Sequence, residues 1–163
     1  MPDLLTHALV AYILAAVVAQ SDRIQDRYVS VAMVGAVAPD AMKLSVLLNH
    51  SVGHIAGIPY STWGVHTLGG VLVLAGLGAL TIRVGDRFVA GAALAAGGAS
   101  HLFLDAFVIR VDGVAPPYLF PFSGWLPPAA NLYASTDVWP AAVALSVAVP
   151  VWLCRRRRGR RSE

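Results

Sequence analysis

Residues 99–107, Ala-Ser-His-Leu-Phe-Leu-Asp-Ala-Phe, place a histidine and a carboxylate inside an otherwise apolar run of helical length. Residues four apart lie on the same face of an α-helix, so His101 and Asp105 point in the same direction. Such side chains are costly in an apolar environment and need a partner or a function. The fold must therefore bring other polar groups to face them.

The composition of the whole chain is that of a membrane protein. Of its 163 residues, 57% are hydrophobic and 13% are charged, and the mean hydropathy is +0.66. A typical soluble domain carries about 25% charged residues. We expect an all-α membrane protein with one multi-pass domain over residues 1–154 and a basic cytoplasmic tail over residues 155–163.

The net charge of +3 comes from six arginines in the last nine residues. Without them the chain has six basic and nine acidic residues. The basic charge therefore marks a tail that anchors the topology and meets anionic head groups, and it does not indicate a nucleic-acid partner. We expect membrane lipids as partners and a multi-pass location in the cell membrane.

Five apolar runs approach the roughly 20 residues that a spanning helix needs. They are residues 4–20, 28–48, 66–82, 88–109 and 138–154. We therefore expect about five transmembrane helices.

The basic residues orient these helices. Short charged connections at 21–27 and 83–87 alternate with longer connections at 49–65 and 110–137. Because basic residues favour the cytoplasmic side, the short connections and the tail are expected inside and the N-terminus outside. A cleaved signal peptide is the alternative for the first run, but no basic residue precedes Leu4, so we expect this helix to be retained.

Six polar residues fall in the outer half of this arrangement, although none of them was used to orient it. They are His7, Asp40, His66, His101, Asp105 and Asp137. Imidazole and carboxylate are suitable ligands for a divalent metal ion, with zinc or manganese preferred here. Ligands from several helices are how metal sites in helix bundles are built. We expect His7, Asp40, His66, His101 and Asp105 to supply the ligands.

Each of these residues also has a simpler interpretation. His7 fits a hydrogen-bonded structural residue, and His66 fits the interfacial start of a helix. Asp40 fits a cap or a partner of Lys43, and His101 with Asp105 fits a plain hydrogen-bonded pair. Their convergence on one side of the bilayer favours the ligand interpretation.

Two further features lie on the outer side. His50 and His54 are interpreted as surface or gate residues. The aromatic and proline-rich connection at 115–125 is interpreted either as a lid that excludes water or as a passive belt at the membrane interface.

Four short motifs resemble a known family. Leu5-Thr6-His7, Pro39-Asp40, His66-Thr67 and residues 100–105 (Ser-His-Leu-Phe-Leu-Asp) resemble the membrane-bound metal-dependent hydrolases, which include the LexA-regulated inner-membrane hydrolase-like proteins. The start of the chain and Trp139-Pro140 resemble the branch of halophilic archaea. The resemblance implies a multi-pass protein with a His/Asp metal site and hydrolytic activity.

The favoured function is metal-dependent hydrolysis of a lipid ester or phosphoester at the outer membrane surface. Asp137 or Asp40 would act as general base, and Arg110 would hold an anionic head group. Two alternatives remain: a non-catalytic structural or interaction protein, in which the polar cluster ties helices together, and a metal or ion transporter.

Overall fold

The computed structural model describes residues 2–20, 25–41, 52–55 and 58–159, with side chains described for residues 4–20, 25–40 and 64–158. His50 and Lys43 lie outside the described residues. His54 lies on a strand of which only the backbone is described, so the interpretations of these three residues stay predictions.

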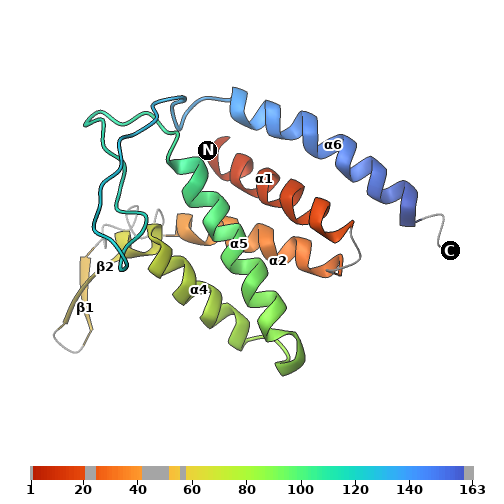
Figure 1. The fold of residues 1–163 in the computed structure, drawn as a ribbon, viewed down its shortest axis with the longest axis horizontal. Coiled ribbons are helices and arrows are strands. Elements are labelled where there is room, and N and C mark those ends of the chain that lie inside the picture. The colour runs from red at the N-terminus through yellow and green to blue at the C-terminus, as the bar shows by residue number, and fades with distance from the viewer. Residues whose placement is uncertain (1, 21–24, 42–51, 56–57, 160–163) are drawn as a thin grey trace.

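The described residues form helices and one small hairpin (Figure 1). The α-helices are α1 (Pro2–Ala19), α2 (Arg27–Val37), α4 (Leu68–Leu80), α5 (Arg87–Asp105) and α6 (Trp139–Gly159). The 3₁₀ turns are η1 (Ala38–Ala41), η2 (Thr62–His66) and η3 (Val84–Asp86), and the strands are β1 (Val52–Ile55) and β2 (Ile58–Ser61). Each of the five expected runs therefore contains an α-helix.

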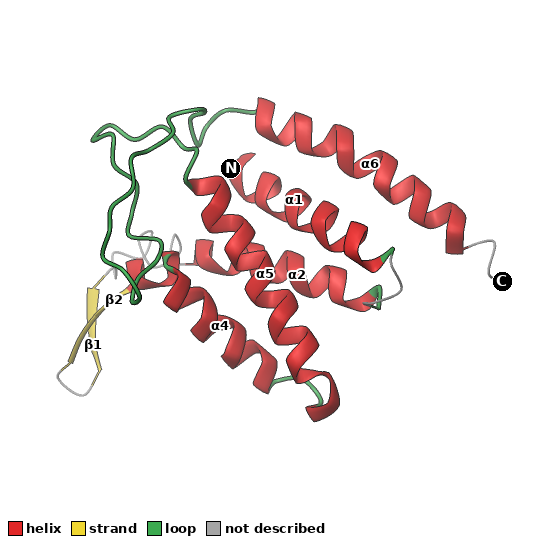
Figure 2. Ribbon diagram, in the orientation of Figure 1, coloured by secondary structure: helices red, strands yellow, loops and turns green. Residues whose placement is uncertain are grey.

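The helices pack in the sequence α6, α1, α2, α5 and α4, with α5 also touching α1 (Figure 1). Figure 2 shows the hairpin and the long loop after α5 at the same end of the molecule. The strands pair antiparallel, with Val52 opposite Ser61 and Ile55 opposite Ile58. This hairpin lies in the longer connection at 49–65.

The helices differ in how closely their lengths match the thickness of a membrane. At 1.5 Å per residue, α5 is about 28 Å long, close to the roughly 30 Å of a bilayer core. By length and composition, Val84–Asp105 is the described helix that qualifies as a candidate span, and Leu4–Ala19 and Leu68–Leu80 are shorter apolar helices.

The prediction of one continuous helix over residues 28–48 is wrong. Helix α2 ends at Val37 and tightens into η1, which contains Pro39 and Asp40. Proline lacks the N–H that would continue the α-helical hydrogen bonds, which explains the change. Two other boundaries also shift: α5 ends at Asp105, and α6 runs on through the first arginines of the predicted tail.

Small residues form the interior and large ones face outward. The buried apolar residues are mostly alanines, whereas Val34, Val73, Leu77 and Phe88 are exposed. Phe88 is 87% exposed. Soluble monomers rarely show such extensive apolar surface, whereas a lipid environment accommodates it.

Two glycines bring α2 and α5 together at their crossing. A Cβ atom added to Gly97 would collide with the backbone of Ala32 and Ala36, and one added to Gly35 would collide with the backbone of Leu94. The two backbones are therefore in direct contact, as small residues permit in membrane bundles.

Thr67 caps the start of α4. Its Oγ1 accepts a hydrogen bond from the N–H of Gly70 at 3.1 Å and donates one to the carbonyl of Gly64 at 2.7 Å. Because His66 immediately precedes Thr67, the cap also fixes the backbone position from which the His66 side chain projects.

We predict that Gly97→Ala destabilises the protein by about 1–3 kcal/mol, because the added methyl forces α2 away from α5. Thermal unfolding in detergent measures the effect. Gly76→Ala is the matched control, because nothing lies within 4 Å of the added Cβ. Equal unfolding temperatures for the two variants would contradict the close crossing.

We predict that Thr67→Ala lowers the stability by about 1 kcal/mol through loss of the cap, whereas Thr67→Ser retains most of it. The same unfolding assay compares the two variants. If serine and alanine behave alike, the hydroxyl does not act as the cap.

Candidate metal centre

The predicted ligands meet at one end of the bundle. They come from four segments: α1 carries His7, η1 carries Asp40, η2 carries His66, and α5 carries both His101 and Asp105. All five are buried, and His7 and His101 have no exposed surface. The other buried polar residues of the described chain, Thr6 and Thr67, are their direct neighbours in sequence. We call the five residues the His/Asp cluster.

Helix α5 presents the pair that the sequence singled out. His101 and Asp105 are four residues apart, and Nε2 of the histidine lies 3.4 Å from Oδ2 of the carboxylate. From Arg87 at the start of α5 to His101 the helix rises about 21 Å. The pair is therefore far from the charged connection that precedes this helix.

The backbone of α2 fixes the tautomer of His101. Its Nδ1 lies 2.8 Å from the carbonyl oxygen of Ala36. A carbonyl accepts hydrogen bonds and cannot donate them, so Nδ1 carries the proton. In the neutral ring Nε2 then presents a lone pair, the form in which histidine binds a metal ion. Metal-bound histidines commonly donate their second nitrogen to such a carbonyl.

The close α2–α5 crossing makes this hydrogen bond possible. Gly97 and His101 are four residues apart on α5 and thus share a face. Ala36 belongs to the last turn of α2, where carbonyl groups lose their intrahelical partners. The absence of a side chain at Gly97 lets this carbonyl approach the imidazole.

His66 and Asp40 face the same nitrogen of His101. The Nε2 atoms of His66 and His101 are 3.2 Å apart. Oδ1 of Asp40 lies 3.5 Å from His66 Nε2 and 3.7 Å from His101 Nε2. Oδ2 of Asp105 lies 3.6 Å from His66 Nε2. Nδ1 of His66 has no hydrogen-bond partner among the described residues, so its ring is less firmly oriented than that of His101.

These separations fit ligands around one ion. Zinc binds nitrogen and oxygen at about 2.0–2.2 Å, which places two ligands of a tetrahedral ion about 3.3 Å apart. The contacts of His66 and His101 with each other, with Asp40 and with Asp105 span 3.2–3.7 Å, and the two carboxylates belong to different groups of candidate ligands. Without a cation, the lone pair of His101 Nε2 would face two carboxylates, so the donor set fits a divalent metal ion.

His7 joins the cluster from the other side of Asp105. Its Nε2 lies 3.3 Å from Oδ1 of that carboxylate, whose second oxygen faces His66 and His101. The ring of His7 stacks on that of His101, with centroids 3.9 Å apart. Two ligand groups result, His7–Asp40–His101 and His66–His101–Asp105, and within each group the candidate atoms lie within 4.8 Å.

Asp137 and Arg110 are not part of these groups. Oδ2 of Asp137 accepts a hydrogen bond from the backbone N–H of Ala134 at 2.9 Å, in the turn that leads into α6. Arg110 contacts Tyr118, a residue that the sequence analysis treated only as part of the loop. Ala36 was also missed, because a backbone carbonyl leaves no signal in the sequence.

The connection at 115–125 is anchored at one point and exposed at another. The N–H groups of Leu68 and Gly69 donate to the carbonyls of Tyr118 and Phe120, at 2.7 and 2.9 Å. Tyr118 is buried, whereas Phe122 and Trp125 are exposed. The loop thus combines a fixed cover over the start of α4 with an aromatic tip.

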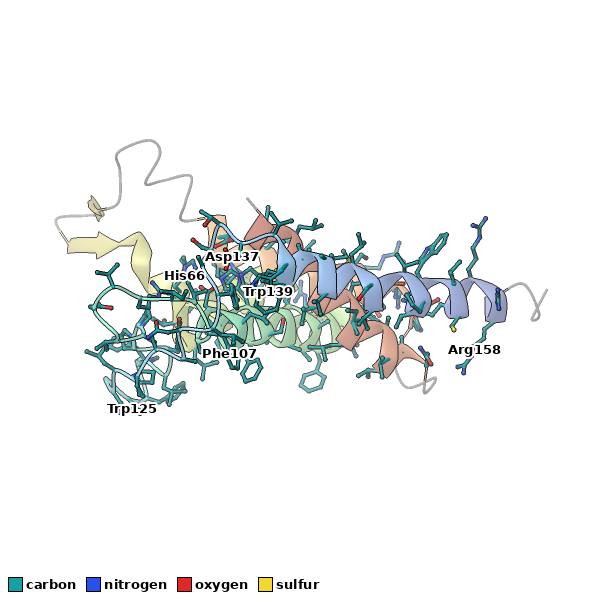
Figure 3. The ribbon with its side chains drawn as sticks, turned by 90° about the horizontal axis from the view of Figure 1, so that it is seen from above. His66, Phe107, Trp125, Asp137, Trp139 and Arg158 are labelled. Atoms are coloured by element: carbon teal, nitrogen blue, oxygen red, sulfur yellow. The ribbon has the colours of Figure 1, made fainter. Side chains whose placement is uncertain are left out.

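Charged residues gather at the opposite end of the molecule. Asp86 accepts hydrogen bonds from Arg27 at 2.9 Å and from Tyr28 at 2.8 Å, and Arg155 pairs with Asp26. Figure 3 places His66 and Asp137 toward the loop and Arg158 at the far end of α6. The arginines of α2 and α6 that are named here thus lie away from the His/Asp cluster.

Comparison with known proteins gives one match. No curated protein and no solved structure matches the chain. A family model described as YdjM inner membrane protein matches residues 1–162, nearly the whole chain. The chain therefore belongs to the YdjM inner membrane protein family.

Proposed function

We propose that the His/Asp cluster binds a divalent metal ion, zinc or manganese, and that the protein is a membrane-bound hydrolase of the branch found in halophilic archaea. The observation that carries this proposal is the set of donor atoms 3.2–3.7 Å apart, drawn from separate segments. The hydrogen bond from His101 to Ala36, which leaves Nε2 free to bind, supports it further.

The residues around the ion have separate tasks in this proposal. A bound divalent ion lowers the pKa of a water molecule to about 7. His66, His101 and Asp105 would hold the ion, and the Asp105 oxygen that faces His7 would keep that contact. Asp40 is the favoured general base because it faces both histidines, and Asp137 is the second candidate.

An apolar groove supports a lipid substrate. A cavity of about 520 Å³ between α1 and α2 is lined by Leu4, Ala8, Met33, Val34, Val37, Ala38 and Asp40. Its volume is in the range of small-molecule sites, roughly 300–1,000 Å³. Asp40 is the charged residue of this lining and also belongs to the cluster. An ester or phosphoester lipid would reach the cluster laterally from the membrane along this groove.

A structural role is the alternative with support from the same contacts. The cluster joins α1, η1, η2 and α5, so it would tie these segments together without catalysis. A transport role has less support, because the buried polar residues of the described chain gather at one end. A permeation route would require such groups along its length.

We infer five spans, with the N-terminus outside and the C-terminus in the cytoplasm. The gathering of the arginine-rich connections and of α6's basic end on one side supports this orientation. The cluster would then lie in the outer half of the membrane.

We expect the purified protein to contain a divalent metal ion, measured by elemental analysis. His66→Ala, His101→Ala and Asp105→Asn should each lower the metal content severalfold, because each removes a donor atom. Asp112→Asn, a change of an exposed acid, is the matched control. The same three variants should lose hydrolysis of fluorogenic lipid esters or phosphoesters.

If the fully buried His101 is needed for folding, the metal content of His66→Ala still tests the site. A fully metallated His101→Ala protein would refute the assigned site. A well-folded wild-type protein with neither metal nor turnover would favour the structural alternative.

Cysteine labelling tests the orientation. Gly124→Cys in a Cys154→Ser background should react with a membrane-impermeant maleimide in intact cells, because Gly124 is exposed and its Cβ would meet no atom within 4 Å. The native Cys154, beside the arginines, should react only after lysis. The reverse pattern would place the cluster on the cytoplasmic side.

A further inference from the structure

Arg110 is held at a fixed place just beyond α5. Its backbone N–H donates to Oδ1 of Asn131 at 2.8 Å, and the N–H of Ile109 donates to the carbonyl of Tyr133 at 2.8 Å. The hydroxyl of Tyr133 in turn donates to the carbonyl of Leu104 near the end of α5. The long loop thereby fixes the backbone of Arg110 relative to Asp105.

The guanidinium of Arg110 lacks an anionic partner within the described chain. Its Nη2 donates to the hydroxyl of Tyr118 at 3.5 Å, which is long for a hydrogen bond. Its Nε is buried and has no hydrogen-bond partner among the described residues. The ion pairs of that part of the chain do not include Arg110. A half-buried, permanently charged guanidinium without an anionic partner is a favourable site for binding an anion.

Tyr118 links Arg110 to the His/Asp cluster. Its ring is buried against Val71, Leu102 and Ala115. Burial and the negative charge of Asp105 raise the pKa of its hydroxyl, while Arg110 opposes the rise. Leu102 follows His101 on α5, so this packing places Tyr118 beside the segment that carries His101 and Asp105. The hydroxyl stays protonated and can donate a hydrogen bond.

The charges of this region favour an anionic ligand. When both are ionised, Asp40 and Asp105 would balance the two charges of one divalent ion. Arg110 then adds a positive charge that no carboxylate of the described chain neutralises by direct contact. The guanidinium fork matches the oxygens of a phosphoryl group and binds them through two parallel N–H bonds.

We propose that Arg110 and Tyr118 form a phosphate-binding subsite next to Asp105, so that the substrate of the cluster is a phosphoester and not a carboxylic ester. This inference rests on the proposed function, which left both substrate classes open. Arg110 binds the phosphoryl oxygens through its guanidinium, and Tyr118 donates its hydroxyl to one of them.

Binding of inorganic phosphate to the full-length, metal-loaded protein, measured by calorimetry in detergent, tests the subsite. Arg110→Gln should weaken binding roughly tenfold to a hundredfold, because a charge-assisted pair is lost. Tyr118→Phe should weaken it about three- to tenfold and keep the buried ring in place. Arg110→Lys should restore part of the affinity.

Arg83→Gln is the matched control, because it removes an exposed arginine on the charged side of the molecule. The control should bind phosphate as the wild type does. Metal content and unfolding temperature should be unchanged in Arg110→Gln and Tyr118→Phe, which separates a ligand-binding role from a structural one.

Nanodiscs of phosphatidylcholine, with and without phosphatidic acid, identify the source of the phosphoryl group. Competition by phosphatidic acid in the wild type but not in Arg110→Gln supports a lipid head group, and binding of free phosphate alone supports a soluble phosphoester.

Equal phosphate affinity in the wild type and Arg110→Gln would overturn the subsite, because the ion alone would then bind the anion. Absence of phosphate binding to the wild type would also overturn it. A protein without metal that still binds phosphate through Arg110 would refute the proposed function and leave the subsite standing.

Discussion

The hydrogen bond from His101 Nδ1 to the carbonyl of Ala36 is the contact on which the rest of the cluster depends. It requires α2 to end where it does, so that this carbonyl is available, and it requires α5 to lie against the α2 backbone. Gly97 satisfies the second requirement, because any side chain there would collide with α2. Backbone geometry thus sets the tautomer of the neutral imidazole and the direction of its lone pair.

Burying two carboxylates among three imidazoles imposes a second constraint. Isolated charges of this kind are too costly to bury, and a shared cation offsets the cost for all of them together. Asp105 illustrates the sharing, since one oxygen faces His7 and the other faces His66 and His101. The arrangement therefore suits metal binding better than three separate hydrogen bonds would.

The sequence was sufficient to predict the members of the cluster. His7, Asp40, His66, His101 and Asp105 stand out because polar residues in apolar runs are rare, and the arginines placed all of them on one side. The break of α2 at Val37 was missed, because apolar residues continue on both sides of Pro39 and Asp40 and hide the change of backbone. His66 was expected to open a helix but ends a 3₁₀ turn, since Thr67 provides the cap. Arg110 and Tyr118 are eight residues apart in a loop, where no periodicity reveals a contact.

Helix α6 contributes none of the cluster residues; it packs along α1 and pairs with Asp26 through Arg155. Every segment that carries a residue of the His/Asp cluster precedes residue 106. During synthesis, which proceeds from the N-terminus, these segments are all available before α6 emerges from the ribosome. The order of biosynthesis thus permits the His/Asp cluster to assemble first, with α6 arriving afterwards as a brace that secures the helix carrying His7.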